Sequence, residues 1–281
     1  MNASGEVIVD ARSRSRRLIG WFALFCGLFC LVCYPPILGA GSLSDAQWWV
    51  FAIMWSPGIA ALLARLVVQR NLHGMGWRPA WRMVTLAWAI PLALCLLVYG
   101  SVWLSGLGGF EPSNIPGDVP VAGRIALLAT LGVLWSLTRA AGEELGWRGL
   151  LLPELSKLMT PARAAVISAI VWALYHYPAI LLTDYNSEAP RAYALLMFTL
   201  DVFAVSFLMA WLRLRSGSFW PAAMLHASHN LFVQVIFDQS TVNGPLTPYI
   251  TTEFGAGLTA AYGLLAFWLW RRWPPKPASS S

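Results

Sequence analysis

Long apolar runs alternate with short polar stretches along the whole chain of 281 residues. Each run has close to the ~20 residues that a helix needs to cross the hydrocarbon core of a bilayer. The expected spans are Leu18–Leu38, Gln47–Val68, Met83–Leu104, Ile125–Glu144, Ala164–Leu182, Ala192–Leu214, Trp220–Phe237 and Gly255–Trp270. The pattern therefore predicts an all-α membrane protein, a polytopic bundle of about eight transmembrane helices.

Composition indicates the same class of protein. Apolar residues make up 58% of the chain and charged residues only 11%, and there are 16 tryptophans. Ordinary soluble domains are about 45–50% apolar and about 25% charged. The formal net charge is +6, but the basic residues form no stripe with interleaved aromatic residues of the kind that binds nucleic acid. We therefore expect a lipid bilayer around the protein and no nucleic-acid partner.

The basic residues gather in every second loop between the expected spans. These residues are Arg12, Arg14, Arg16, Arg17, Arg70, Arg78, Arg82, Arg148, Lys157, Arg163, Arg213, Arg215, Arg271, Arg272 and Lys276. The loops between them are mainly acidic and carry Asp45, Glu111, Asp118, Asp184, Glu188, Asp238 and Glu253. Because short loops rich in Lys and Arg stay in the cytoplasm, both termini are expected there.

Two adjacent carboxylates, Glu143 and Glu144, stand at the end of the apolar run that begins at Ile125. A charge deep in a membrane helix costs roughly 2.5–3.5 kcal/mol, so partners are expected. On a helix, Arg148 lies four residues after Glu144 and on the same face. Arg139 lies four residues before Glu143 in the same way. One such pair would be an ordinary ion pair at a membrane interface, but a doublet with a cation on each side indicates a polar site.

Polar side chains also occur inside two later spans. His176 lies in the fifth span, and His226 and Asn230 lie in the seventh. At a rise of ~1.5 Å per residue, each histidine is about 15–20 Å from the cytoplasmic end of its helix. Glu143 reaches the same depth if its helix continues to about Lys157. A lone intramembrane histidine is often a hydrogen-bond partner between helices. His226 and Asn230 are four residues apart, so their side chains lie on the same helix face and point toward the same space. Two hydrogen-bond donors without a cation are suited to binding an anionic oxygen.

These groups resemble the motifs of the CAAX prenyl endopeptidase and bacteriocin-processing family (CPBP, or Abi) of intramembrane proteases. The EExxxR motif of that family corresponds to Glu143–Arg148, its FxxxH motif to Trp172–His176 and its HxxxN motif to His226–Asn230. Order and spacing agree, and the resemblance covers roughly Arg124–Asn230. The departure is Trp172 in place of phenylalanine, which keeps an aromatic side chain.

The resemblance implies a peptidase that acts on a membrane-embedded or lipidated peptide. Peptide hydrolysis needs a base to activate water and donors where the carbonyl oxygen becomes negative. Glu143 is the expected base, and His176 is expected to share the water. His226 and Asn230 are expected to hold the oxyanion.

The roles of the two carboxylates and of a metal stay open at this point. Glu144 is expected to be structural and paired with Arg148, but this division of roles rests on the family rather than on spacing. Alternatively, Glu143, His176 and His226 would make a three-ligand site for a divalent metal such as zinc, with one open position.

Two other classes of function compete with a peptidase. A proton-coupled transporter also places charges in the membrane, and Asp201 in the sixth span suits a proton path. Such a path needs neither a His/Asn donor pair nor a glutamate doublet. A bacteriocin self-immunity protein without catalysis is the other alternative, although degraded motifs would be expected of it and here they are intact. His229 is on a different face of its helix from His226 and is expected to pack against neighbours.

The resemblance also suggests how the chain is organised. The expected segments are a cytoplasmic tail (1–17), N-terminal transmembrane helices (18–123), a CPBP-like catalytic core (124–237), a loop with the last helix (238–273) and a disordered tail (274–281). The expected location is the bacterial inner (plasma) membrane.

Overall fold

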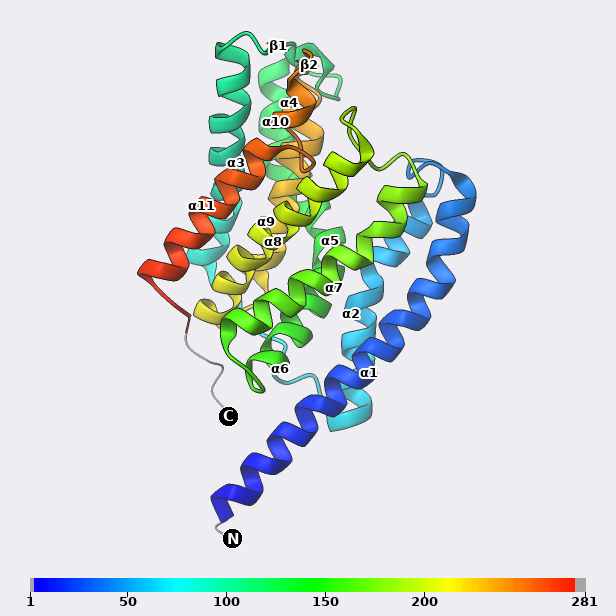
Figure 1. Cartoon of the computed structure of the whole chain (residues 1–281), viewed down its shortest axis with the longest axis vertical. Coiled ribbons are helices and arrows are strands. Elements are labelled where there is room, and N and C mark those ends of the chain that lie inside the picture. The colour runs from blue at the N-terminus through cyan, green and yellow to red at the C-terminus, as the bar shows by residue number, and fades with distance from the viewer. Residues whose placement is uncertain (1–2, 276–281) are drawn as a thin grey trace.

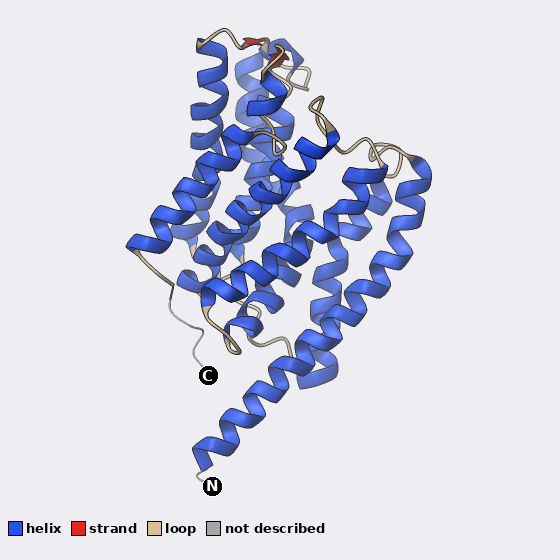
Figure 2. Cartoon of the chain, viewed as in Figure 1, coloured by secondary structure: helices blue, strands red, loops and turns tan. Residues whose placement is uncertain are grey.

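The computed structural model describes residues 3–275, with side chains from residue 10 onward. This part of the chain is a bundle of helices with one small two-stranded sheet (Figures 1 and 2), so the predicted all-α membrane fold is confirmed. The helical elements are α1 (Ala3–Ala40), α2 (Gln47–Gln69), α3 (Trp81–Leu104), η1 (Pro112–Asn114), α4 (Val121–Leu127), η2 (Leu128–Gly132), α5 (Val133–Glu144), η3 (Leu145–Leu151), α6 (Leu152–Ser156), α7 (Pro161–Leu182), α8 (Arg191–Ser216), α9 (Trp220–Asn230), η4 (Leu231–Phe237), α10 (Thr247–Ile250) and α11 (Ala256–Arg272). The strands β1 (Gly108–Phe110) and β2 (Thr241–Asn243) pair antiparallel.

Within the described residues, 6 helical segments are long and apolar enough to cross a membrane. They are Asp10–Ala40, Gln47–Gln69, Trp81–Leu104, Val121–Ser156, Pro161–Leu182 and Arg191–Ser216. The other two expected spans are also helical, as α9 followed by η4 and as α11. The α9 segment carries His226, His229 and Asn230, which make it more polar, and α11 has only 17 residues.

The helix that carries the glutamate doublet is longer than the expected apolar span and ends close to Lys157, as the depth of Glu143 required. The expected span ends at Glu144, whereas the helical segment runs on through η3 and α6 to Ser156. Glu143 and Glu144 therefore lie in the interior of a helix. Buried charges are tolerated at such a depth when they are paired inside the protein instead of facing lipid.

The two ends of the chain differ from expectation in different ways. Helix α1 begins at Ala3, so most of the expected tail of residues 1–17 continues the first helix. Of the expected disordered tail at residues 274–281, positions 276–281 lie outside the described residues. The division of the chain into five segments stays a prediction.

Glycines bring α2 into direct backbone contact with α5 and η3. A Cβ atom added to Gly146 would lie 2.4 Å from Cβ of Pro57, and one added to Gly142 would lie 2.7 Å from the carbonyl oxygen of Met54. On the α2 side, a Cβ atom on Gly58 would lie 2.5 Å from the carbonyl oxygen of Gly142. Small residues allow such close packing of membrane helices. This contact fixes α2 against the helix that carries the glutamate doublet.

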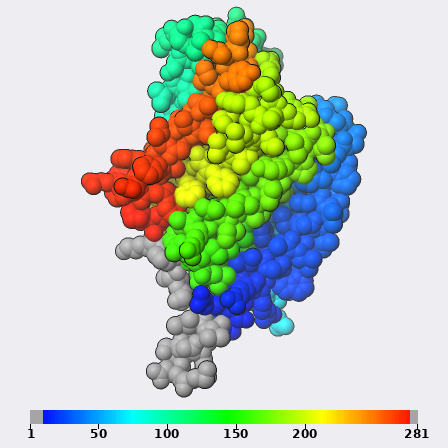
Figure 3. All heavy atoms as spheres, viewed as in Figure 1, coloured from blue at the N-terminus to red at the C-terminus, as the bar shows by residue number. Residues whose placement is uncertain are grey.

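The helices alternate in direction between two ends of the molecule. Figure 1 shows the start of α1 and the end of α11 toward one end, together with the connections from α2 to α3 and from α6 to α7, and the sheet at the other end. On the face seen in Figure 3, α1 and α11 lie at opposite edges with α7 and α8 between them. The basic loops therefore share one end of the molecule, as expected. The exception is Arg148, which was expected in one of these loops but is buried within η3. The assignment of this end to the cytoplasm stays a prediction.

Candidate active site

One cavity brings the predicted site residues together. It has a volume of about 550 Å³ and is lined by Glu143, His176, His226 and Asn230, with Arg139 also on its wall. These side chains come from α5, α7 and α9, which are separated in sequence. Most of the remaining wall is apolar and comes from α1, α2, η2 and η4. Polar groups inside a membrane protein are expected to face such an interior space and not the lipid.

Two helices change their winding directly after a site residue. The wider π-helical winding of η3 begins at Leu145, after the glutamate doublet, and that of η4 begins at Leu231, after Asn230. Such segments are rare, usually shorter than these, and often occur at functional sites. The local backbone is therefore unusual at two of the three helices that carry the motifs.

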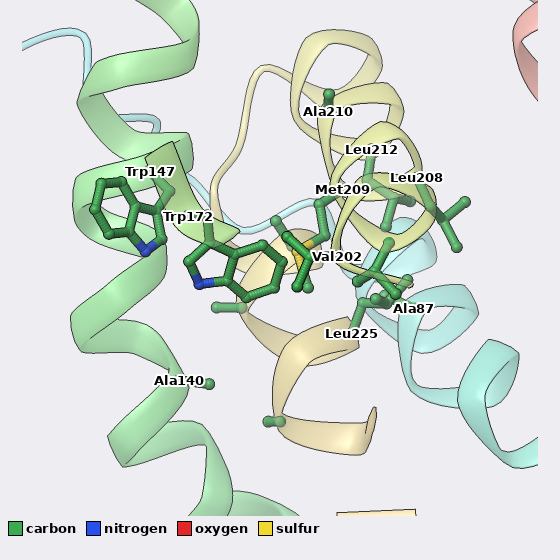
Figure 4. Packing of buried hydrophobic residues seen from close by; sticks show 14 of the residues in the cluster. Ala87, Ala140, Trp147, Trp172, Val202, Leu208, Met209, Ala210, Leu212 and Leu225 are labelled. Carbon is green, nitrogen blue, oxygen red and sulfur yellow. The ribbon is translucent and has the colours of Figure 1, made fainter. Parts of the chain in front are cut away.

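Glu143 is held by two indole rings. Glu143 is buried, with only 2% of its surface exposed. Its Oε2 atom accepts one hydrogen bond from Nε1 of Trp172 at 2.8 Å and another from Nε1 of Trp147 at 3.4 Å. Figure 4 shows these two indoles side by side, contributed by α7 and η3. Among the described residues no hydrogen bond reaches Oε1, so this oxygen stays available on a side chain that lines the cavity.

Sequence reasoning missed the role of Trp172, which it treated as a simple substitute for phenylalanine. The indole N–H is a donor that phenylalanine lacks. Its ring also lies under the guanidinium of Arg148, whose Cζ is 4.5 Å from the ring centroid. The sequence signal was the tryptophan itself, because a buried indole usually finds an acceptor.

Glu144 is the centre of a buried ion pair. It is 0% exposed, as is Arg148, and its Oε1 atom accepts from Nη1 of Arg148 at 2.9 Å, as the spacing predicts. The same oxygen accepts from Nδ1 of His226 at 3.0 Å. A second nitrogen of Arg148, Nη2, donates to Oγ of Ser206 on α8 at 3.0 Å. Glu144 therefore fixes the ring of His226 and leaves its Nε2 atom for the cavity.

His176 is oriented by its own helix. Its Nδ1 atom donates to the backbone carbonyl of Trp172 at 2.8 Å. The ring packs against Tyr175 and Phe198, with centroids 5.3 and 5.4 Å away. With the proton on Nδ1, the Nε2 atom of the neutral ring is an acceptor. His176 can therefore take a hydrogen bond from a water molecule in the cavity.

The predicted pairing of Arg139 with Glu143 is wrong. None of the ion pairs among the described residues includes Arg139. Its guanidinium lies over the ring of Trp135, with Cζ 5.6 Å from the centroid, and its buried Nε atom has no hydrogen-bond partner. The reason is that Glu143 turns toward the two indoles instead. Arg139 is thus a cation on the cavity wall without a carboxylate partner.

The alternative of a metal centre gains no support from the arrangement of the ligands. In the part of the chain that the structure describes, no group of three or more His, Cys, Asp and Glu side chains is placed to hold a metal ion.

A second polar network borders the site and was not predicted. Glu253, in the loop before α11, accepts from Nε2 of Gln234 at 2.9 Å and from Nε2 of His229 at 3.4 Å. The other ring nitrogen of His229, Nδ1, forms a hydrogen bond of 3.0 Å with the hydroxyl of Tyr262. Burial acts to raise the pKa of the Glu253 carboxyl, but the hydrogen bonds and the charge of His229 outweigh it and lower the pKa. The loop is thereby fixed against α9 and η4.

The fold and the cavity together define an integral membrane protein with a polar site buried among its helices. Residues 125–232 match the family described as type II CAAX prenyl endopeptidase Rce1-like. The matched segment contains all three motifs, so the resemblance to CAAX-type intramembrane proteases is confirmed over these residues. No curated protein sequence matched the chain.

Proposed function

We propose that the protein is an intramembrane endopeptidase that hydrolyses a peptide bond in a membrane-associated or lipidated peptide. The observation that carries the proposal is the shared cavity, which is lined by a carboxylate, two imidazoles and an amide. The family match supports a protease of the CAAX type.

In the proposed reaction, Glu143 accepts a proton from a water molecule that also donates to Nε2 of His176. The water oxygen forms a bond to the carbonyl carbon of the substrate, and the carbonyl oxygen becomes negative. When the C–N bond breaks, Glu143 returns the proton to the leaving amine nitrogen. The free Oε1 atom supports this role, because the two indoles fix the carboxylate through Oε2 alone.

His226 and Asn230 are the proposed donors to the negative oxygen. Both lie on the cavity wall, four residues apart on α9. The Nδ1 atom of His226 stays bonded to Glu144, so Nε2 donates when the ring carries a proton on both nitrogens. Donors placed in advance stabilise the transition state because they do not have to reorient. Glu144 and Arg148 are then positioning residues behind His226.

The cavity also supports the proposed class of substrate. Its volume of about 550 Å³ falls within the ~300–1,000 Å³ of typical ligand pockets. Apolar side chains such as Ile37, Val50 and Leu231 line it and would contact an apolar peptide or a lipid chain. Arg139 offers a cation to an anionic or carbonyl group of the same substrate.

Proteolysis by the purified protein in detergent or liposomes tests the proposal, with a mixture of membrane peptides as substrate. Glu143→Gln should remove nearly all turnover, because it keeps the shape of the side chain and removes the base. The matched control is Glu188→Gln, which changes an exposed glutamate in an outer loop and should leave turnover unchanged.

Two further measurements separate the alternatives. Chelation should leave the rate unchanged at equal protein stability, and metal analysis of active enzyme should find no stoichiometric ion, whereas a zinc centre would lose activity on chelation. Full activity of Glu143→Gln, together with proton uptake into liposomes that depends on Asp201, would favour the transporter instead.

A further inference from the structure

A second, smaller cavity lies directly behind the proposed catalytic groups. Its volume is about 40 Å³, and His176, His226 and Asn230 line it as well as the main cavity. Its far wall carries Asp201 of α8 and Glu253. These three residues, together with Tyr185, line both spaces, of which the larger is mainly apolar and the smaller is rich in polar groups.

Asp201 is buried in the wall of the small cavity, and no protein group that the structure describes compensates for its burial. The residue is 3% exposed, and its Oδ1 atom is fully buried without a hydrogen-bond partner. It forms none of the ion pairs found among the described residues. Leaving a buried polar atom unpaired destabilises a protein, and a charged group does so more strongly. A buried carboxylate with no protein partner calls for a ligand, and Asp201 is one of the residues that line the small cavity.

The size and the chemistry of the small cavity fit water. A water molecule needs roughly 10–15 Å³ of such volume and two to four polar partners, so about 40 Å³ holds two or three molecules. Asp201 supplies an acceptor, and the amide of Asn230 supplies both a donor and an acceptor. A metal ion does not fit, since no group of three metal-ligating side chains is placed to hold one in the described part of the chain.

We propose that the small cavity holds the water that the hydrolytic site consumes, and that Asp201 is the positioning residue that retains it. This inference rests on the proposed peptidase function. Each hydrolysis adds one water molecule across the C–N bond and yields one acid and one amine. A peptide in the main cavity displaces water from its apolar walls, so the next molecule is supplied from behind His176, His226 and Asn230.

The test replaces Asp201 by two side chains of nearly the same size as aspartate. Asp201→Asn keeps polar atoms that bind water, so kcat should stay within about threefold of the wild type. Asp201→Leu removes them, and kcat should fall about 10- to 100-fold with KM unchanged, the loss expected when a reactant is poorly placed. The kcat is expressed per folded molecule, because a smaller folded fraction alone lowers the apparent kcat with KM unchanged. A purely structural role of Asp201 would therefore leave this corrected kcat at the wild-type value.

A second variant fills the cavity without touching Asp201. Val202 lines the small cavity beside Trp172 and Met209 (Figure 4), and Val202→Leu adds one methylene group there. Val202→Leu should lower kcat about 10- to 100-fold with KM unchanged, as Asp201→Leu should. If Asp201→Leu does not fold, Val202→Leu alone tests whether the small cavity supplies water. The matched control is Val171→Leu, which adds the same group on the exposed face of α7 and should leave kcat unchanged.

Three results would overturn the inference. The first is that Asp201→Leu or Val202→Leu keeps the wild-type kcat while Glu143→Gln is inactive. This result would refute the role of the small cavity and leave the peptidase proposal intact. The second is a KM that rises in step with the loss of kcat, which would indicate substrate binding. The third is an Asp201→Asn variant as inactive as Asp201→Leu, which would indicate that the negative charge acts and not the retention of water. Full activity of Glu143→Gln would instead remove the peptidase proposal itself.

Discussion

Trp172 decides which oxygen of the Glu143 carboxylate stays free of hydrogen bonds from the protein. Both indole donors reach Oε2 of Glu143, so the two oxygens of one carboxylate differ in their surroundings. A hydrogen bond to a charged acceptor contributes about 1.5–3 kcal/mol, enough to hold the group in one orientation. The departure from the family motif therefore has a chemical effect in this chain.

Trp172→Phe should lower kcat roughly 10- to 100-fold, which corresponds to the loss of that hydrogen bond. KM should change little, since the aromatic ring remains. The control is Trp220→Phe, in which the lost N–H donates to the backbone carbonyl of Trp77 at 2.8 Å, next to the connection between α8 and α9. Steady-state kinetics of both variants measure this effect. Equal kcat values for Trp172→Phe and the wild type would show that the indole does not orient Glu143.

At the scale of elements, the contact of α2 with α5 and η3 sets the shape of the site. The three glycines at this contact leave no room for a side chain, so the two helices cannot be repacked by small adjustments. The cavity is lined by the residues of α2 and α5 that lie beyond the contact, among them Val50 and Arg139. The distance between the helices therefore controls the width of the cavity beside the Glu143 carboxylate.

Gly146→Ala should destabilise the protein by about 1–3 kcal/mol, the usual cost of forcing an extra group into a packed contact. The added Cβ would lie 2.4 Å from Cβ of Pro57 and 2.7 Å from its backbone oxygen. The matched control is Gly100→Ala in α3, where an added Cβ has no atom within 4 Å. Thermal unfolding in detergent measures the effect, and similar midpoints for the two variants would show that the contact adapts.

The sequence predicted what depends on composition and spacing. Apolar runs of bilayer length located the helices, and the three motifs identified the residues that line the main cavity. Spacing could not predict what depends on tertiary structure. The i,i+4 rule paired Glu144 with Arg148 correctly and Glu143 with Arg139 wrongly, because indoles from neighbouring elements compete for Glu143. Hydropathy ended the motif span at Glu144, because the charges that follow are paired inside the bundle. The continuation to about Lys157, which the sequence left as a condition, agrees with a helical segment that ends at Ser156.

At the scale of the whole molecule, orientation in the membrane determines where the cavity leads. Leu43, Ser44 and Gln47, at the connection between α1 and α2, line the main cavity. In Figure 1 this connection lies away from the end at which α1 begins. If the basic loops are cytoplasmic, the cavity extends toward the opposite side of the membrane.

Cysteine labelling at two loop positions tests this orientation. In a variant without the native cysteines, Arg78→Cys should react only with a reagent that reaches the cytoplasm, because it lies in a basic loop. Asp118→Cys should react with an impermeant reagent from the opposite side. Labelling of Asp118→Cys from the cytoplasmic side would show that the orientation is reversed.

The buried chain from Arg148 through Glu144 to His226 has a consequence for the conditions under which the protein works. Mobile ions weaken interactions between exposed charges over a distance of about 8 Å at physiological ionic strength, but they act much less on buried pairs. Both Arg148 and Glu144 are 0% exposed, so salt cannot enter between them. The exposed basic loops, in contrast, lose their attraction to lipid phosphates as salt rises. A change in salinity would therefore alter how firmly the loops hold the membrane surface and leave the orientation of His226 unchanged.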